Sequence, residues 1–419
     1  MDTTIHNNIF SKRDAKKMYK KARTYAEFLS SVISSKKYEH PESALYVAGD
    51  VSYQNKIKKS LARFSALKHV VLIGIGGSSL GTEAVYHALK KSDSPTLTVL
   101  DTLSTDALEA FQNLLKKTKM SEHIAVVIVS KSGTTTETVW NAGIAISMLK
   151  QKFGETYTER VIVISDTESE LLVRAKKQKI LTFTIPQSIG GRYSVFTAVG
   201  IVPLTLLGID VFALCAGAKN ALLPDTLLAH GERSVFLGLY AQRGYHTYNF
   251  FTFEPKLSAL GYWYRQLLAE SFGKTTTRNG KKFTHQLLPT VSTSIDLHSV
   301  AQLYLGGYTN IITHFFVTEK SSNYLLPDTW ITEHLSFLSG TELANVSSYI
   351  SQSVLRAYDD QSLPYFKTSL THIDAFTVGN LLTTSMLEVM HICNLFEVNA
   401  FDQPNVESYK KYVRDALNS

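Results

Sequence analysis

The sequence predicts an α/β protein of two doubly wound domains, in which parallel sheets are flanked by helices, followed by a C-terminal helical arm. The length of 419 residues exceeds the size at which one hydrophobic core usually stops growing. From Lys68 onward, short apolar runs rich in β-branched residues alternate with amphipathic stretches. Continuous apolar strands are typical of parallel sheets covered on both faces, which bind ligands beyond the carboxyl ends of their strands.

We expect the first domain over residues 46–210 and the second over residues 211–398. The predicted strands of the first domain are residues 70–75, 97–100, 124–129, 161–164 and 181–185. In the second domain we expect strands at 247–253 and 311–317, and helices at 256–271, 332–358 and 373–396. Residues 1–45 are predicted to form a helical segment, with its helix at 11–35, that packs on the second domain. Residues 399–419 should form a turn and a last helix at 409–417.

The composition is that of an ordinary globular protein, with 44% hydrophobic and 19% charged residues. The net charge of +7 comes from dispersed basic residues, apart from a cluster at 12–23 that indicates a solvated helix face, so we expect no nucleic-acid binding. Only Cys215 and Cys393 are present, and we expect buried thiols rather than a disulfide or a zinc site. No segment has the about 18 uninterrupted apolar residues of a membrane span, and no signal peptide is visible. We expect a cytoplasmic protein.

A glycine-rich segment, GIGGSSLG at residues 74–81, follows the first predicted strand and opens a helix. Backbone N–H groups around Gly77 and Ser78 can face an anion there, because glycine permits close approach and a helix N-terminus carries partial positive charge. Taken by itself the segment fits a tight turn equally well. Its spacing matches neither the Walker pattern nor the dinucleotide fingerprint.

A second segment, SKSGTTTET at residues 130–138, follows the strand at 124–129. A capping box between Thr134 and Glu137 would explain part of it. The remaining hydroxyls exceed what capping needs, and they indicate a ligand. Two such turns in one α/β domain suggest one phosphate group gripped from two sides.

A third segment, GGRYS at residues 190–194, precedes a strongly apolar helix. The glycines allow a turn that aims Arg192 inward, where its planar charged fork suits a phosphate or a developing enolate oxygen. A surface arginine in a turn is an equally good interpretation of this motif.

The second half carries residues suited to proton transfer. Glu270 stands in the last turn of a predicted helix, where the macrodipole disfavours a carboxylate, and it precedes Ser-x-Gly-Lys. A partly buried carboxylate can move a proton between C2 and C1 of an open sugar. His298 follows Asp296 closely in the sequence, and a histidine side chain can give or take a proton when a cyclic sugar opens. In the turn at 400–410, Lys410 could be a cationic partner of the sugar or a solvated lysine.

In their order, these six segments resemble the phosphoglucose isomerase family in its shorter bacterial form, from about Gly74 to Lys410. The resemblance implies two sugar-isomerase (SIS) domains that interconvert glucose 6-phosphate and fructose 6-phosphate through a cis-enediolate, with no metal and no organic cofactor. The implied roles are Glu270 as the base, Arg192 as the stabiliser of the enediolate, and His298 and Lys410 in ring opening. The implied substrate-binding residues are Gly77, Ser78, Ser130, Lys131, Ser132, Thr135 and Gln403.

The resemblance also implies a homodimer, because the family's histidine reaches the site from the neighbouring subunit. The chain departs from the family's terminal signature at two positions, with Asn405 in place of the usual glycine and Ala400 in place of a frequent proline. Asparagine tolerates positive φ better than most residues, so we expect Asn405 to preserve the turn.

Three alternatives stay open. One is an isomerase or aminotransferase of another phosphosugar, which would reuse the same hydroxyl-rich loops. Another is a non-catalytic sugar-phosphate sensor, although both Glu270 and His298 are present. The weakest is a dehydrogenase, for which Asp101 would be the acidic residue that binds the ribose.

Overall fold

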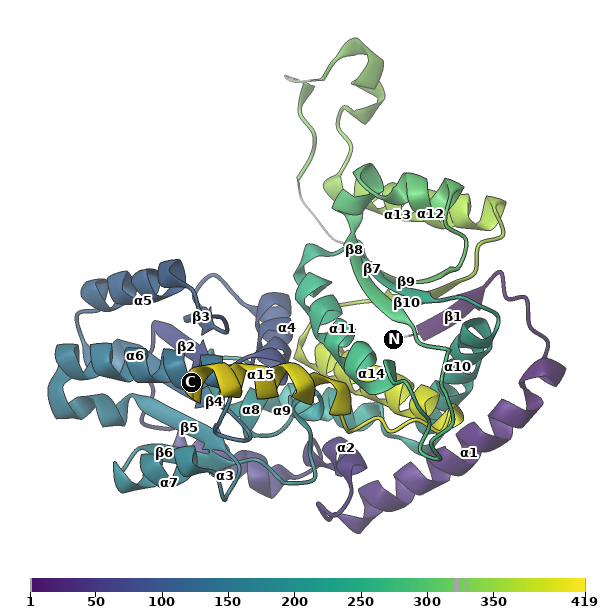
Figure 1. The fold of residues 1–419 in the computed structure, drawn as a ribbon. Coiled ribbons are helices and arrows are strands. Elements are labelled where there is room, and N and C mark those ends of the chain that lie inside the picture. The colour runs from purple at the N-terminus through teal and green to yellow at the C-terminus, as the bar shows by residue number, and fades with distance from the viewer. Residues whose placement is uncertain (1, 320–323, 329–330, 419) are drawn as a thin grey trace.

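The computed structural model describes residues 2–319, 324–328 and 331–418 and contains two five-stranded sheets (Figure 1). The first sheet has the order β3-β2-β4-β5-β6 and is parallel throughout. Its strands are β2 His69–Ile73, β3 Thr96–Leu100, β4 Ile124–Val129, β5 Val161–Ser165 and β6 Leu181–Thr184. These strands confirm all five runs predicted for the first domain.

Helices cover both faces of the first sheet, because alternate strand residues point to opposite sides. Val71 and Ile73 pack with the helices α5 Thr105–Lys117, α6 Thr136–Phe153 and α7 Glu170–Lys177. Val70 and Leu72 face the other side, toward α3 Val51–Ser60, α4 Leu80–Leu89 and α8 Ala198–Leu206. The doubly wound α/β architecture is therefore confirmed for this half.

The second sheet has the order β8-β7-β9-β10-β1. Its strands are β1 Asp2–His6, β7 Thr247–Thr252, β8 Leu288–Thr293, β9 Ile311–Thr318 and β10 Tyr365–Leu370. All neighbours are parallel except β1, which runs antiparallel to β10 at the edge. The polar residues of β1 carry no strand signal, yet His6 stacks on Tyr365 with 4.5 Å between ring centroids.

The helices of the second half are α9 Val211–Asn220, α10 Pro224–Gln242, α11 Ser258–Phe272, α12 Ala301–Gly306, α13 Leu343–Asp360 and α14 Ala375–Leu395. The N-terminal helix α1 Lys12–Ser35 packs on α10 and α14, and the short α2 Ala44–Val47 follows it. The helix predicted at 332–358 is interrupted. A 3-10 helix, η9 Glu333–Leu338, and α13 flank a break at Ser339 and at Gly340, which has φ +67°.

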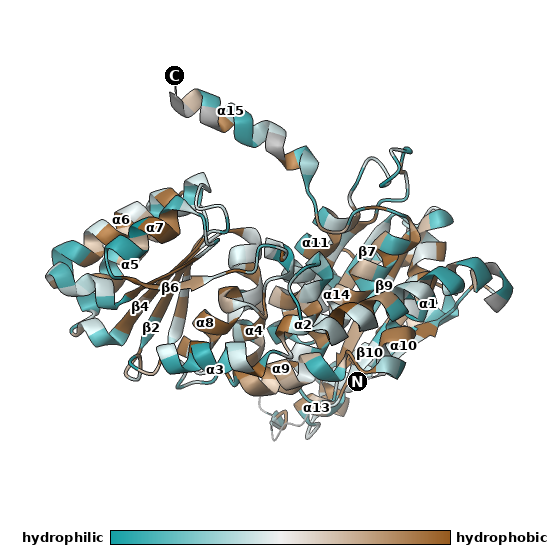
Figure 2. Ribbon diagram, turned by 90° about the horizontal axis from the view of Figure 1, so that it is seen from below, coloured by the Kyte–Doolittle hydropathy of each residue, from teal (hydrophilic) through white to brown (hydrophobic). Residues whose placement is uncertain are grey.

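The two halves share one hydrophobic core, in which α11 of the second half packs against α4 of the first. Two segments project from this body. Between β9 and α13, the described residues 324–328 and 331–342 rise above the second sheet (Figure 1). The C-terminal helix α15 Glu407–Asn418 stands away from the main body (Figure 2). No single helix in the described ranges has the length and hydropathy to cross a membrane, and only α9 and α10 together, bent by 72°, meet those criteria.

Candidate active site

The glycine-rich loop after β2 packs directly on the loop that carries Arg192. The 3-10 helix η2 Gly76–Ser78 contacts the 3-10 helix η5 Gly191–Tyr193. A Cβ atom on Gly77 would lie 2.3 Å from the carbonyl carbon of Gly191, so only glycine fits there. Gly76 has φ +60°, and a Cβ on it would lie 2.8 Å from Nε2 of Gln266 on α11. The loop therefore joins the first sheet to both the arginine and α11.

The hydroxyl-rich loop after β4 lies at the same carboxyl edge of the first sheet. Oγ of Ser130 accepts a hydrogen bond from the backbone N–H of Gly133 at 3.1 Å and donates to Oγ1 of Thr135 at 3.3 Å. Ser132 is exposed and accepts from N and Oγ1 of Thr134, while Ser78 on the neighbouring loop is half-buried. The ammonium group of Lys131 is already bound to the protein, unlike that of a lysine that binds only a phosphate group. Its Nζ donates to the carbonyl oxygens of Gln187 at 2.7 Å and Ile189 at 2.9 Å, and burial lowers its pKa.

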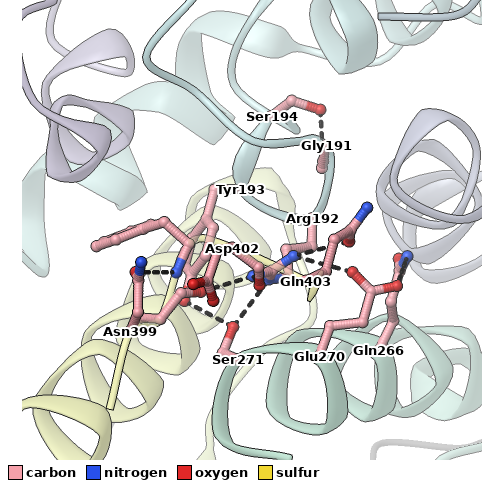
Figure 3. A network of polar contacts seen from close by, with 12 residues as sticks. Gly191, Arg192, Tyr193, Ser194, Gln266, Glu270, Ser271, Asn399, Asp402 and Gln403 are labelled. Carbon is pink, nitrogen blue, oxygen red and sulfur yellow. Dashed lines mark hydrogen bonds and ion pairs between the residues drawn. The ribbon is translucent and has the colours of Figure 1, made fainter. Parts of the chain in front are cut away.

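Arg192 points inward and is 3% exposed, which decides between the two interpretations of its motif (Figure 3). Its Nε donates to Oγ of Ser271 at 2.9 Å, and its Nη1 donates to Oε2 of Glu270 at 3.0 Å and Oε1 of Gln403 at 3.2 Å. Its Nη2 donates to the carbonyl oxygens of Ala400 at 2.7 Å and Asp402 at 2.9 Å. All five guanidinium donors are therefore engaged by the protein itself.

Glu270 lies in the last turn of α11 and is held at both carboxylate oxygens. Oε1 accepts from Nε2 of Gln266 at 2.9 Å, and Oε2 accepts from Arg192. Its side chain is 30% exposed, against 3% for Arg192, so the carboxylate stays accessible. Nearby positive charge offsets the unfavourable macrodipole at this helix end. Gln266, which sequence analysis did not single out, lies one turn before Glu270.

Lys274 is a second buried cation at this helix end, and sequence analysis did not assign it a role. Its Nζ donates to the carbonyl oxygens of Glu270 and Asp402 and lies 3.2 Å from Oδ1 of Asp402. Burial lowers its pKa, and the charge of Arg192 lowers it further. Arg192 and Lys274 thus both bind the C-terminal turn. In the sequence, the feature that could have identified Lys274 is its position in the Ser-x-Gly-Lys segment directly after Glu270.

The C-terminal turn places Gln403 beside Arg192 without any positive φ at Asn405, which lies in the 3-10 helix η10 Pro404–Val406. Asn405 therefore takes part in the turn without using the positive φ that asparagine tolerates. Ala400 contributes its carbonyl oxygen, a group that proline also offers, so the substitution keeps the bond to Arg192. Lys410 lies on α15, beyond this turn.

His298 lies apart from this cluster. It is exposed at the end of the 3-10 helix η7 Ser294–His298, and no hydrogen bond within the described ranges joins it to Glu270 or Arg192. Asp296 does not pair with it but caps η7 by accepting from the backbone N–H of Thr293 at 2.7 Å. Within the same ranges, no group of three His, Cys, Asp or Glu side chains is arranged to hold a metal ion.

Comparisons with known proteins agree with this geometry. The model of the phosphoglucose isomerase family matches residues 53–418. A glucose-6-phosphate isomerase of Leptospira biflexa is 33% identical over 362 residues, which cover 82% of this chain and 78% of that protein. A glucose-6-phosphate isomerase of Streptococcus agalactiae is 31% identical over 376 residues, covering 85% and 82%.

Solved structures show the same fold. A Thermus thermophilus protein described as hypothetical has a TM-score of 0.86 and 25% identity, and the match covers all of both chains. A glucose-6-phosphate isomerase of Chlamydia trachomatis has a TM-score of 0.80 and 19% identity, covering 99% of this chain and 88% of that one. The family match spans Arg192, Glu270 and Gln403, which the fold brings together. The chain belongs to the phosphoglucose isomerase family.

Proposed function

We propose that this chain interconverts glucose 6-phosphate and fructose 6-phosphate by ring opening and proton transfer through a cis-enediolate. The observation that carries the proposal is the placement of Glu270. It is a partly exposed carboxylate, fixed by Gln266 and Arg192, on a helix that packs against the glycine-rich loop of the first domain. Membership of the family agrees with this chemistry.

Glu270 acts as the base. Its carboxylate takes the proton from C2 of the open aldose. The electrons of that C–H bond form the C1=C2 bond of the enediolate, and those of the aldehyde C=O bond move to O1. The resulting carboxylic acid then returns the proton to C1, while the hydroxyl proton on O2 passes to O1 and leaves a ketone at C2. The two hydrogen bonds that hold the carboxylate fix its direction, which keeps the proton donor and acceptor in line without a reorganisation cost.

Arg192 contributes charge and position. Its donors are all engaged, so it acts on the enediolate through its positive charge and through Gln403, which it holds. Lys274 adds a second buried cation nearby. Fixed positive charge in a site with little water stabilises a developing anion more than the same charge in water does.

The first domain binds the phosphate group through Gly77, Ser78, Ser130, Ser132 and Thr135, with Lys131 holding the loop at residues 187–189 as well as adding charge. The reaction moves protons within one molecule and needs no electron carrier, so we propose that neither a cofactor nor a metal takes part. We place this activity in the cytoplasm.

His298 and Lys410 assist ring opening, with His298 supplied by a second subunit. The exposure of His298 and its separation from the Glu270 cluster support a role at another chain's site. The working molecule is then a homodimer with two sites at the interface.

Solvent deuterium exchange tests the activity. Purified protein treated with EDTA is incubated with fructose 6-phosphate in D₂O, and NMR follows deuterium at C1 and C2. Exchange together with glucose 6-phosphate formation is expected. Binding of fructose 6-phosphate without exchange or product would favour the sugar-phosphate sensor, and activity with another phosphosugar only would favour the other isomerase.

Subunit mixing tests the shared site. Glu270→Gln and His298→Asn homodimers are both expected to be impaired. If His298 acts across the interface, a mixed dimer has one site with both wild-type residues, and random mixing restores about a quarter of the wild-type rate. If both residues act in one chain, no mixed site is complete and the rate stays at the level of the separate variants.

A further inference from the structure

A chain of buried polar side chains in the second domain has no role in the chemistry proposed above, yet it reaches the helix that carries the base. Glu388, on α14, is 4% exposed and lies in the core of that domain. Its Oε1 accepts a hydrogen bond from the phenol of Tyr264, on α11, and one from the phenol of Tyr248, on β7, at 3.4 Å. Its Oε2 lies 3.6 Å from Nε of Arg233, on α10. One carboxylate therefore joins α14 to two other helices and a strand.

The hydrogen bonds of this chain all run toward the carboxylate. Burial and the charge of Glu388 raise the pKa of both tyrosines well above 10, so both phenols keep their protons and donate them. Burial lowers the pKa of His314 well below 6.5, so this histidine, whose Nδ1 lies 2.6 Å from the Tyr248 phenol, is neutral. With its hydrogen on Nδ1 it donates to that phenol, and its Nε2 accepts from the hydroxyl of Thr368 at 2.7 Å. Each group of the chain then has a partner, and the Glu388 carboxylate is held in one place.

The bond to Glu388 holds α11 near the middle of its length. Tyr264 is the seventh of the 15 residues of this helix, and it is 2% exposed. Its ring stacks on that of Tyr248 with 5.1 Å between the centroids. Glu270 follows six residues later, about 9 Å along the helix axis and about 120° around it. A rotation of α11 that withdraws Tyr264 from Glu388 therefore swings Glu270 by the same angle.

A small rotation of α11 is enough to misplace the base. A side-chain atom about 6 Å from the helix axis moves by about 1 Å when the helix turns by about 10°, and a misplacement of about 1 Å can lower a rate by about 10²-fold. Apolar contacts resist such a turn less than a hydrogen bond does, because a hydrogen bond depends on direction. Arg192 and Lys274 hold the C-terminal end of α11 at Ser271 and at the carbonyl oxygen of Glu270. Tyr264 supplies a second fixed point, away from that end.

We propose that Glu388 and Tyr264 are positioning residues for the isomerisation, which fix the rotation of α11 and with it the direction of the Glu270 carboxylate. The inference rests on the proposed function, in which Glu270 is the base. A purely structural contact would be served as well by apolar side chains, because a buried ion pair is often no more stable than well-packed apolar residues in its place. The pair of Arg233 and Glu388 therefore indicates a need for direction rather than for stability.

The kinetics of Tyr264→Phe test the position of the base. This variant keeps the ring and its stacking and loses only the O–H group that binds Glu388. We expect kcat to fall about tenfold and KM for fructose 6-phosphate to change less than about threefold, because the C-terminal end of the helix stays fixed. The matched control is Tyr240→Phe, on α10, whose buried phenol accepts from the backbone N–H of Ile9 at 3.4 Å. The control should lose stability and keep its kcat.

A triple variant separates position from stability. Arg233→Met/Tyr264→Phe/Glu388→Leu replaces the ion pair and its phenol by apolar side chains, and its free energy of unfolding in urea should equal or exceed that of Tyr264→Phe. Its kcat should nevertheless stay about tenfold below that of the wild type. Glu388→Gln is the conservative variant. It keeps an oxygen that accepts from Tyr264, so its kcat should lie within about threefold of the wild type.

Three results would overturn the inference. They are a wild-type kcat in Tyr264→Phe or in the triple variant, a loss of kcat in Tyr240→Phe as large as that in Tyr264→Phe, and a Glu388→Gln variant as slow as the triple variant. Glu270→Gln distinguishes these failures from that of the proposed function. An inactive Glu270→Gln beside a fully active Tyr264→Phe removes the positioning role alone, whereas full activity in Glu270→Gln removes the proposed function.

Discussion

The two walls of the candidate site are built differently. On the first domain, the loops at residues 74–81 and 130–138 offer hydroxyls and backbone groups, with Ser132 exposed and Ser78 half-buried. The other wall is formed by Arg192, near the end of the first domain, and by Glu270 and Lys274 of the second. These side chains are fixed by bonds from several segments of the chain. We infer that the first wall supplies affinity for the phosphate group and the second supplies rate, so variants of the two walls should separate KM from kcat.

The largest effect is expected for Glu270→Gln. The amide keeps the shape of the side chain but cannot take a proton, so kcat should fall by about 10²–10⁴-fold while affinity for phosphosugar changes less than about tenfold. Steady-state kinetics and calorimetric binding of fructose 6-phosphate measure the two quantities. Undiminished kcat would show that Glu270 is not the base. It would also contradict the assignment of affinity to the first wall and rate to the second.

Lys274→Met should lower kcat/KM by about 10²-fold. Removing the ammonium group leaves the carbonyl oxygens of Glu270 and Asp402 without their donor, which loosens both the end of α11 and the C-terminal turn. Lys282→Met, at an exposed position close in sequence, is the matched control.

If Lys274 positions the end of α11 and the C-terminal turn, two further measurements should change. Limited proteolysis should cut the variant faster within residues 399–419, and Lys274→Arg should recover part of the activity. If the activity falls while the proteolysis pattern stays as in the wild type, Lys274 acts through its charge only.

On the first wall, Ser78→Ala should raise KM about tenfold and change kcat little. The expected loss of binding free energy corresponds to one hydrogen bond to a charged group. Kinetics with fructose 6-phosphate measure it, and inorganic phosphate as a competitive inhibitor should weaken in parallel. A fall in kcat with constant KM would place Ser78 among the groups that act on the transition state.

The smallest effect concerns the acid sensitivity of the second half. Burial lowers the pKa of His391 to about 3 and that of His230 to about 2, so both are neutral in the folded protein. The unfolded chain binds a proton near pH 6.5, whereas the folded one excludes it. The stability is therefore full above that pH and falls as the pH drops from 6.5 toward 3.

For His391 this loss is about 0.8 kcal/mol at pH 6. His391→Leu should remove this loss of stability, so the free energy of unfolding should change less between pH 8 and pH 6 than in the wild type. Urea unfolding at the two pH values measures the difference, and His372→Leu, at an exposed position, should leave the pH dependence unchanged. An unchanged pH dependence in His391→Leu would assign the acid sensitivity to other groups.

The sequence predicted the first sheet well, because its strands are short runs rich in apolar residues and two of them, β4 and β5, are buried on both faces. It did not predict β1, since an edge strand needs no apolar run and takes its partner β10 from the far end of the chain. Glu270 and Arg192 were singled out from their own segments of the sequence, and Gln403 through the family resemblance. Their direct bonding was not predicted, because 78 and 211 residues separate the bonded pairs. Lys274 was missed because spacing along the chain does not distinguish a buried lysine from a solvated one.

The bonds of Arg192 have a consequence for synthesis of the protein. The arginine is made before the middle of the chain, but three of its five acceptors belong to residues 400–403. During translation the first domain can fold early, since domains form in order as the chain emerges. Its guanidinium group then has no partner from residues 400–403, and its bonds to them form only after these residues have left the ribosome. We therefore expect no isomerase activity from a nascent chain before residues 400–403 have emerged.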